Sequence, residues 1–191
     1  MKVTFYKSIL ETKEITPADK IVFCQMLYVS LMDKNCSFSF SSDGEFSTEL
    51  YEDDFGGYVP IPNYVSEQMI TDILDISRRQ YYLSCQRLKK AGYIVKNEFG
   101  KCLKLISLSP YFELKVKTGL RNLALIVYSY IAHKEERYGY VDTYHDALAR
   151  DLHISFSSLE KILSSLYANN LVQSKRVHYQ RILKTTLPGE R

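Results

Sequence analysis

The clearest alternation of apolar and polar positions lies between residues 76 and 108. A helix that turns by about 100° per residue gathers one mostly apolar face from Tyr81, Ser84, Cys85 and Leu88. Its opposite face carries the basic, amide and aromatic residues Arg79, Tyr82, Leu83, Gln86 and Lys90. Ser77 is suited to cap the start of this helix, and Gly92 to the left-handed position just past its end.

The residues that follow Gly92 predict a two-stranded hairpin. Residues 93–95 and 101–106 are extended, mainly apolar runs, and the polar stretch 97–100 lies between them. The sequence therefore predicts a helix followed directly by a hairpin with a polar tip.

Two earlier helices precede this pair. Thr16-Pro17-Ala18-Asp19 is a strong helix start, with a capping threonine, a proline at the first helical position and an acid in the first turn. Apolar residues at helical spacing extend this helix to about Asp33 and predict a second helix over 66–74. A short extended segment at 58–62 joins them.

The same plan recurs 78 residues later. His153-Ile154-Ser155 repeats Asp75-Ile76-Ser77, and Asn170 takes the place of Gly92, where asparagine is the usual second choice. The repeat predicts helices that start near Leu120, Asp142 and Ser155, and a closing hairpin over 171–186. We interpret this as an internal duplication.

The predicted fold class is mainly α with small β (α+β), built as two tandem winged helix-turn-helix domains. The first covers residues 1–110, 111–118 is a connector, and the second covers 119–191. The first contains an acidic insertion at 35–57, which is either a mobile surface insertion or a hairpin that mediates dimerisation or contacts a partner. A short strand is expected near residues 3–6.

Composition narrows the class of protein. Of 191 residues 46% are hydrophobic, which is ordinary for a globular protein. No apolar run approaches the length of about 18 residues that a membrane span needs, and the start of the chain lacks a signal-peptide core. A cytoplasmic, nucleoid-associated protein without membrane contact is expected.

The chain carries no recognisable catalytic or metal motif. The four cysteines form no Cys-x-x-Cys pair, and the four histidines are scattered. The eight glycines do not form a phosphate-binding loop, and a Gly-x-Ser-x-Gly elbow is missing. We therefore expect no enzyme, no cofactor, no metal and buried free thiols.

Charge is distributed very unevenly. Residues 35–77 contain nine acids and no Lys or Arg, whereas residues 78–191 contain 20 Lys and Arg against nine acids. Positive charge begins where the helix at 78 begins. A polyanion would be attracted to that part of the chain and repelled by the other.

The first copy resembles the helix-turn-helix domains of plasmid and phage replication initiators and of related regulators on mobile elements. The resemblance rests on residues 16–22, 76–79 and 87–94. It implies that the residues from Ser77 to Gln80 start a recognition helix. The tandem plan is similar to initiators that bind repeated origin sites with two winged helices.

These observations predict sequence-specific binding of double-stranded DNA, as a replication initiator or a transcriptional regulator. The helix that starts at the DNA-binding candidate Ser77 is expected to enter a major groove, with Arg79, Gln80, Tyr82 and Gln86 near the bases. At phosphates we expect Arg78, Arg87, Lys89, Lys90 and Lys101. In the second copy the candidates are Ser157 and Lys161 on the helix and Lys175, Arg176, His178 and Arg181 on the hairpin.

Three questions stay open at this point. The positive charge of the helix at 78–90 is also consistent with an ordinary solvent-exposed surface helix that binds nothing. Tandem winged helices also occur in a bacterial chromosome-condensation subunit, where they bind protein, so an interaction scaffold is the alternative function. A homodimer would suit two-fold symmetric DNA sites. Convergence of Arg78, Arg79, Lys90, Lys175, Arg176 and Arg181 on one surface would favour DNA.

Overall fold

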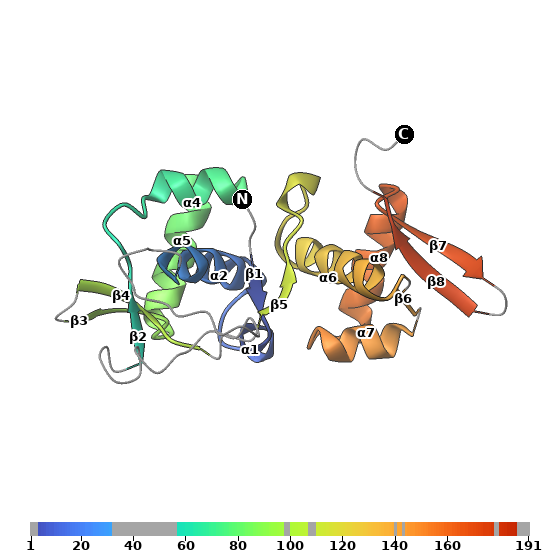
Figure 1. Ribbon diagram of the computed structural model, residues 1–191, viewed down its shortest axis with the longest axis horizontal. Helices are drawn as coiled ribbons and strands as arrows, with labels where there is room; N and C mark the ends of the chain where they lie inside the picture. Colours follow the sequence, from blue (N-terminus) through green and yellow to red (C-terminus); the bar gives the residue numbers. More distant parts are fainter. Residues whose placement is uncertain are drawn as a thin grey trace. The chain divides into compact units, whose positions relative to one another are not determined.

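The computed structural model describes residues 4–31, 57–97, 100–106, 110–139, 141–142, 144–177 and 180–186. The chain divides into two compact units, Met1–Tyr111 and Phe112–Arg191, which we call the N-terminal and C-terminal units and describe separately. Both combine helices with a small antiparallel sheet (Figure 1), so the predicted α+β class is confirmed. The predicted acidic insertion lies outside the described residues, except for Gly57.

The N-terminal unit begins with a short strand and a short helix and then follows the predicted order. Its elements are β1 (Thr4–Tyr6), α1 (Lys7–Glu11), α2 (Pro17–Leu31), β2 (Tyr58–Pro60), α4 (Glu67–Leu74), α5 (Arg78–Lys90), β3 (Ile94–Asn97) and β4 (Gly100–Lys104). The strand β5 (Pro110–Glu113) crosses the boundary between the two units.

Helix α2 starts where the sequence predicts it and lies at the centre of the N-terminal core. The Oγ1 atom of Thr16 accepts a hydrogen bond from the backbone N–H of Asp19 at 3.3 Å, and a carboxylate oxygen of Asp19 accepts one from the Thr16 N–H at 3.1 Å. This reciprocal cap fixes the first turn. Residues 21–27 are all buried, so this part of the helix is covered on every side. The spacing of apolar residues in the sequence predicts burial of one face alone. Burial is wider because α1, α4, α5, β1 and β2 all contact this helix.

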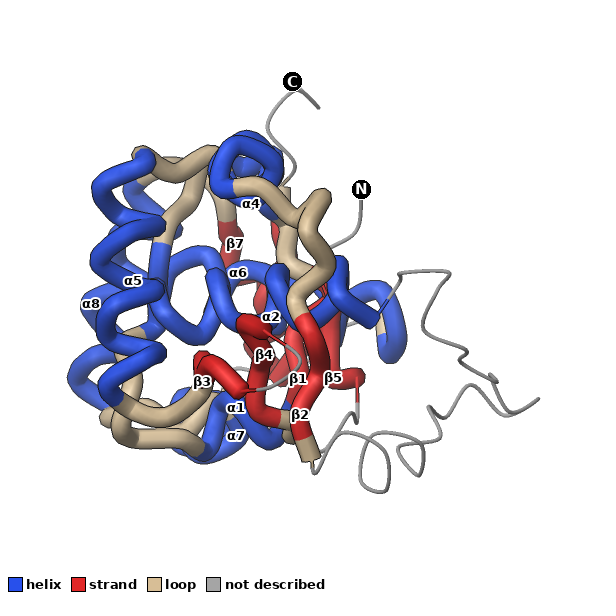
Figure 2. The backbone as a smooth tube through the Cα atoms, turned by 90° about the vertical axis from the view of Figure 1, so that its left-hand side faces the viewer, coloured by secondary structure: helices blue, strands red, loops and turns tan. Residues whose placement is uncertain are grey.

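Helices α4 and α5 meet at a tight turn with a cap at each start. The Ser66 hydroxyl accepts from the Met69 N–H, and the Ser77 hydroxyl accepts from the Gln80 N–H at 3.2 Å. Asp75 between the helices adopts a left-handed conformation, with φ of 50°. Figure 2 shows α4 at the top of the view and α5 at its left. The predicted cap at Ser77 is confirmed.

The end of α5 leads directly into the sheet. Gly92 has φ of +77°, and the Tyr93 N–H donates to the Leu88 carbonyl at 2.8 Å, which closes the helix as predicted. The three strands are ordered β2-β4-β3, with Val59 and Ile94 both opposite Leu103. The hairpin β3–β4 therefore has its register fixed by buried residues at its base.

The C-terminal unit repeats this order of elements. It contains η1 (Val116–Thr118), α6 (Asn122–Tyr138), β6 (Val141–Asp142), α7 (His145–Asp151), α8 (Phe156–Ala168), β7 (Val172–Val177) and β8 (Gln180–Thr185). Its sheet has the order β6-β8-β7, as in the first sheet. Ser155 caps α8, and Asn170 has φ of 54° past its end. Helix α7 is shorter than predicted, because Val141 and Asp142 pair with β8 as a strand.

Candidate nucleic-acid interface

Helix α5 separates its two faces as its periodicity predicts. Ser84 and Leu88 are fully buried against the core of the N-terminal unit. Arg79, Gln86 and Lys90 are exposed on the other side. Between them lie Tyr82, which is 60% exposed, and Leu83, which is 39% exposed. We call Arg79, Tyr82, Leu83, Gln86 and Lys90 the outer stripe of α5.

The outer stripe is cationic and lacks carboxylate partners. Helix α5 contains five basic residues and no acid. Within the part of the chain that the structure describes, no ion pair reaches Arg79 or Lys90. Arg79 lies in the first turn, where the partial positive charge of the helix N-terminus makes a cation unfavourable by a few tenths of a kcal/mol to about 1 kcal/mol. Helix stability therefore does not explain the positive charge at Arg79.

The remaining predicted residues of α5 are partly engaged in local structure. The Arg78 guanidinium donates to Gln68 Oε1 at 2.7 Å and lies 3.6 Å from Glu67 Oε1 on α4. Ser77 uses its hydroxyl as the helix cap, and Gln80 is half-buried. Lys89 is exposed near the helix end.

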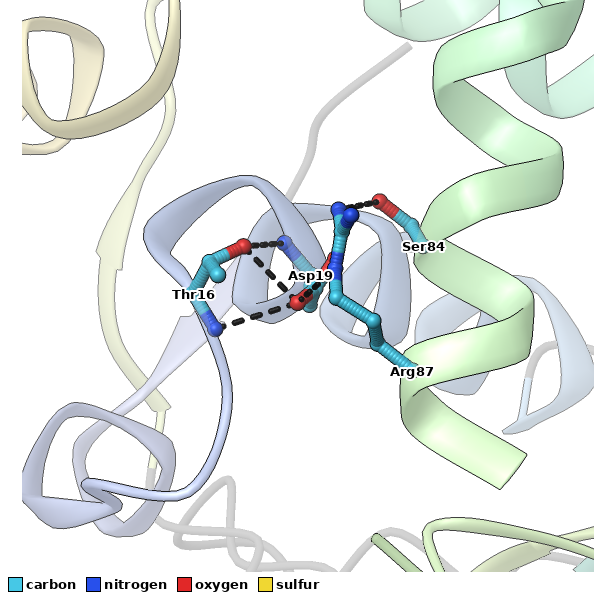
Figure 3. Close-up of polar contacts among 4 residues, drawn as sticks. All are labelled: Thr16, Asp19, Ser84 and Arg87. Carbon is cyan, nitrogen blue, oxygen red and sulfur yellow. Dashed lines mark hydrogen bonds and ion pairs between the residues drawn. The ribbon is translucent and has the colours of Figure 1, made fainter. Parts of the chain in front are cut away.

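Arg87, predicted to meet a phosphate, is engaged in an ion pair within the protein. Its Nε and Nη2 atoms donate to both carboxylate oxygens of Asp19 on α2, at distances of 2.7–3.0 Å, and Nη2 also lies 3.4 Å from the Ser84 hydroxyl (Figure 3). The Asp19 side chain is fully buried, whereas that of Arg87 is 44% exposed. The charge of Arg87 is thus compensated inside the protein, and this residue joins α5 to α2.

The carboxylate of Asp19 is held in its charged form. Burial alone would raise the pKa of Asp19, but hydrogen bonds from Arg87, Ser84 and Thr16 outweigh burial and lower that pKa below its usual value. Helices α2 and α5 are therefore joined by a buried negative charge that depends on its arginine partner. Sequence periodicity gave no signal for this contact, because its two residues are 68 positions apart.

The hairpin beyond α5 adds more positive charge than the sequence analysis assigned to it. Lys101 is exposed on β4, as expected, and the register places Lys96 of β3 directly opposite it. Two like charges opposite each other weaken an antiparallel pair. Lys104 is also exposed, with Nζ 5.8 Å from the centre of the Tyr93 ring. Lys96 and Lys104 are the residues missed, and their alternation with apolar neighbours was the available signal.

The corresponding helix of the C-terminal unit has a different surface. Ser157 and Lys161 are exposed on α8, but Glu160 and Ser164 are exposed beside them, so this face is nearly neutral. Phe156 at its start is 44% exposed and lies 6.0 Å, centroid to centroid, from the His145 ring. On the hairpin, β7 and β8 place Arg176 opposite Arg181.

Several predicted residues of the second hairpin lie outside the described part of the protein. These are the side chains of Lys175, Arg176 and Arg181, and the whole of His178. The convergence of basic residues from both units on one surface is therefore left as a prediction.

Other kinds of site find no support among the described residues. They include no group of three or more His, Cys, Asp or Glu residues placed to hold a metal ion. Cys24, Cys85 and Cys102 are free thiols, and burial raises the pKa of the Cys24 thiol to about 12. No helix in these ranges is long and apolar enough to cross a membrane.

A comparison of the chain with known protein families, with curated proteins and with solved structures found no match.

Proposed function

We propose that the N-terminal unit binds double-stranded DNA in a sequence-specific manner, with α5 in the major groove. The observation that carries this proposal is the outer stripe of α5, which presents exposed Arg79, Gln86 and Lys90 on a helix without a single acid. A major groove admits one helix, and arginine and glutamine can each form paired hydrogen bonds to base edges there. The buried ion pair between Arg87 and Asp19 supports the proposal, since base reading needs a helix held in one orientation.

Roles follow from the position of each side chain. Arg79 and Gln86 face base edges, and Lys89 and Lys90 near the helix end meet phosphates. Lys96 and Lys101, opposite each other on the hairpin, bind the neighbouring backbone, where a phosphate would relieve their mutual repulsion. Arg87 is excluded from the interface, because Asp19 already neutralises it.

The architecture proposed for both units is the winged helix-turn-helix. Its support is the shared order of elements and the shared sheet order, β2-β4-β3 and β6-β8-β7. Together with the resemblance to initiators and regulators of mobile elements, this favours a replication initiator or a transcriptional regulator. The protein would act on plasmid or phage DNA in the cytoplasm, and a homodimer would suit palindromic sites.

A protein-binding scaffold is the second candidate, and the C-terminal unit is what favours it. The exposed face of α8 is nearly neutral, and exposed aromatic residues, Tyr144 and Phe156, lie at the starts of α7 and α8. Aromatic anchors with little net charge are typical of protein interfaces. The two candidates are compatible if the units divide these tasks.

The test is selection of bound duplexes from a random pool at two salt concentrations, followed by binding measurements on the enriched site. Arg79→Ala should weaken binding to that site by about 1–3 kcal/mol and relax the preference at one position. The matched control is Arg150→Ala, which removes an exposed arginine of the C-terminal unit and should leave the preference unchanged. Enrichment of direct repeats would favour an initiator, and a short palindrome a dimeric regulator. If no sequence is enriched, the protein-scaffold function replaces the proposal.

A further inference from the structure

The apolar centre of the outer stripe is the feature that the proposed charge contacts leave unexplained. Of the exposed large hydrophobic residues in the described part of the N-terminal unit, Tyr82 and Leu83 are adjacent on α5, whereas Tyr64 lies outside any helix or strand. Leu83 has no polar atom and does not contribute to the buried face.

The geometry of the helix puts these two residues between the polar ones. Arg79 and Gln86 are seven positions apart, or roughly 10 Å along the helix axis at 1.5 Å per residue. Tyr82 and Leu83 lie three and four positions after Arg79, so they fall within the same stripe and near its middle. A span of roughly 10 Å covers about three base steps at 3.4 Å each. The apolar pair would thus face the two base pairs that lie between those that Arg79 and Gln86 reach.

The chemistry of the major groove offers one matching group. Among the four bases only thymine presents an apolar group in that groove, its C5-methyl, while the other edge groups are hydrogen-bond donors or acceptors. An apolar protein surface beside any other base edge would leave polar base atoms without water or partners. Charge complementarity of the flanking Arg79 and Lys90 fixes the occupant as DNA.

We infer that Leu83, supported by Tyr82, recognises the methyl group of a thymine within the target site, between the bases contacted by Arg79 and Gln86. This inference rests on the proposed DNA binding. It specifies that thymine is the recognised base and that Leu83 is the residue that recognises it. Leu83 is the specificity-determining residue, and Tyr82 covers the contact from solvent.

The test replaces each thymine of the enriched duplex, one at a time, with deoxyuridine, which keeps the hydrogen-bonding groups and removes only the methyl. Wild-type protein should bind about fourfold more weakly when the critical thymine is replaced, from one buried carbon at about 0.8 kcal/mol. Leu83→Ala should bind the thymine and deoxyuridine duplexes equally. The control Tyr64→Ala removes an exposed aromatic side chain outside the stripe and should keep the fourfold difference.

The outcomes separate this inference from the proposed function. If a site is enriched but no deoxyuridine substitution weakens binding, or if Leu83→Ala keeps the full methyl effect, the inference is wrong and DNA binding stands. If no site is enriched at all, both are wrong. If Leu83→Ala leaves DNA binding intact but abolishes capture of a protein partner, the apolar pair is a protein contact instead. Thermal unfolding by circular dichroism, measured for all three proteins, checks that each variant is folded at the temperature of the binding assay.

Discussion

Replacing Arg87 with methionine tests the contact that fixes the orientation of α5. Methionine keeps an unbranched apolar chain of similar length, so the packing of the arginine stem is largely retained. The substitution removes the Nε and Nη2 donors that bind both oxygens of Asp19 at 2.7–3.0 Å. A fully buried carboxylate is then left with the hydrogen bonds from Thr16 and Ser84 and without a cationic partner.

The expected loss follows from the burial of the two partners. Removing one member of a buried ion pair typically destabilises a protein by about 3–5 kcal/mol. The Arg87 side chain is 44% exposed and water screens the pair, so we expect the lower end, about 3 kcal/mol. Arg78→Met is the matched control. Its pair with Glu67, at 3.6 Å with side chains 75% and 46% exposed, is worth at most about 1 kcal/mol.

The assay must resolve the N-terminal unit, because a chain with two compact units need not unfold in one step. Native-state amide hydrogen exchange in α2 and α5, measured by nuclear magnetic resonance over a urea series, reports the free energy of unfolding of that unit alone. Asp19→Asn combined with Arg87→Met removes the orphaned charge and should recover part of the loss. If Arg87→Met costs no more than Arg78→Met, the ion pair does not hold α5 and the argument fails.

The pH dependence of this loss has a definite sign. In the wild type the pKa of Asp19 lies below its unfolded value, so its contribution to stability is present above that value and is lost as pH falls through the folded pKa. Without Arg87, burial dominates and the pKa of Asp19 rises above about 3.9, its usual value. The difference between wild type and Arg87→Met should therefore be largest at neutral pH and shrink as pH is lowered towards 4. A difference that is constant between pH 7 and 4 would contradict the assigned role of the buried charge.

Three further predictions concern other residues of the N-terminal unit. Gly92→Ala should lower the free energy of unfolding by about 1–2 kcal/mol in urea denaturation, because its φ of +77° is strained for a residue with a Cβ. No atom lies within 4 Å of an added Cβ, so no steric clash adds to this loss. Gly92→Asn should cost less, as Asn170 adopts φ of 54° at the corresponding position. Gln25→Met should raise that free energy by about 1–3 kcal/mol, since both polar atoms of the buried Gln25 amide lack hydrogen-bond partners, and an unchanged urea midpoint would contradict this. Lys90→Ala should reduce the slope of log binding constant against log salt by about 1, whereas Lys13→Ala, another exposed lysine, should leave the slope unchanged.

The features that could be predicted from sequence are those with local causes. The cap at Ser77 and the left-handed residue at Gly92 depend on one or two neighbours, so residue type alone indicates them. The two faces of α5 follow from its periodicity. The predicted N-cap residue at Ser155 has the same origin.

The features that were missed have causes distant in the chain. The pairing of Asp19 with Arg87 joins residues 68 positions apart, and no periodicity indicates such a contact. Burial around the whole of α2 depends on how many elements pack against it. Asp142 was assigned to a helix, but the pairing of β6 with β8, in which Asp142 lies opposite Ile182, makes it part of a strand.

The two units have corresponding residues at the buried and helix-capping positions that stabilise the fold. They differ at the exposed positions that the proposed function depends on. Leu88 and Leu166 are buried at corresponding places, and Ser77 and Ser155 cap corresponding helices. Among the described residues, however, only α5 combines a cationic outer stripe with an ion pair to the central helix of its unit, α2. Within the described ranges no ion pair joins α8 to α6.

That combination has a physical rationale. Apolar packing alone tolerates small rotations and shifts of a helix, whereas a bidentate ion pair at 2.7–3.0 Å restricts both. A helix that only packs, or that binds phosphates without regard to sequence, gains little from such restriction. A helix whose Arg79 and Gln86 must meet particular base edges requires it, because a displacement of about 1 Å breaks hydrogen bonds of that length. The position of the ion pair on α5, and not on α8, therefore favours base reading by the N-terminal unit and a different task for the C-terminal one.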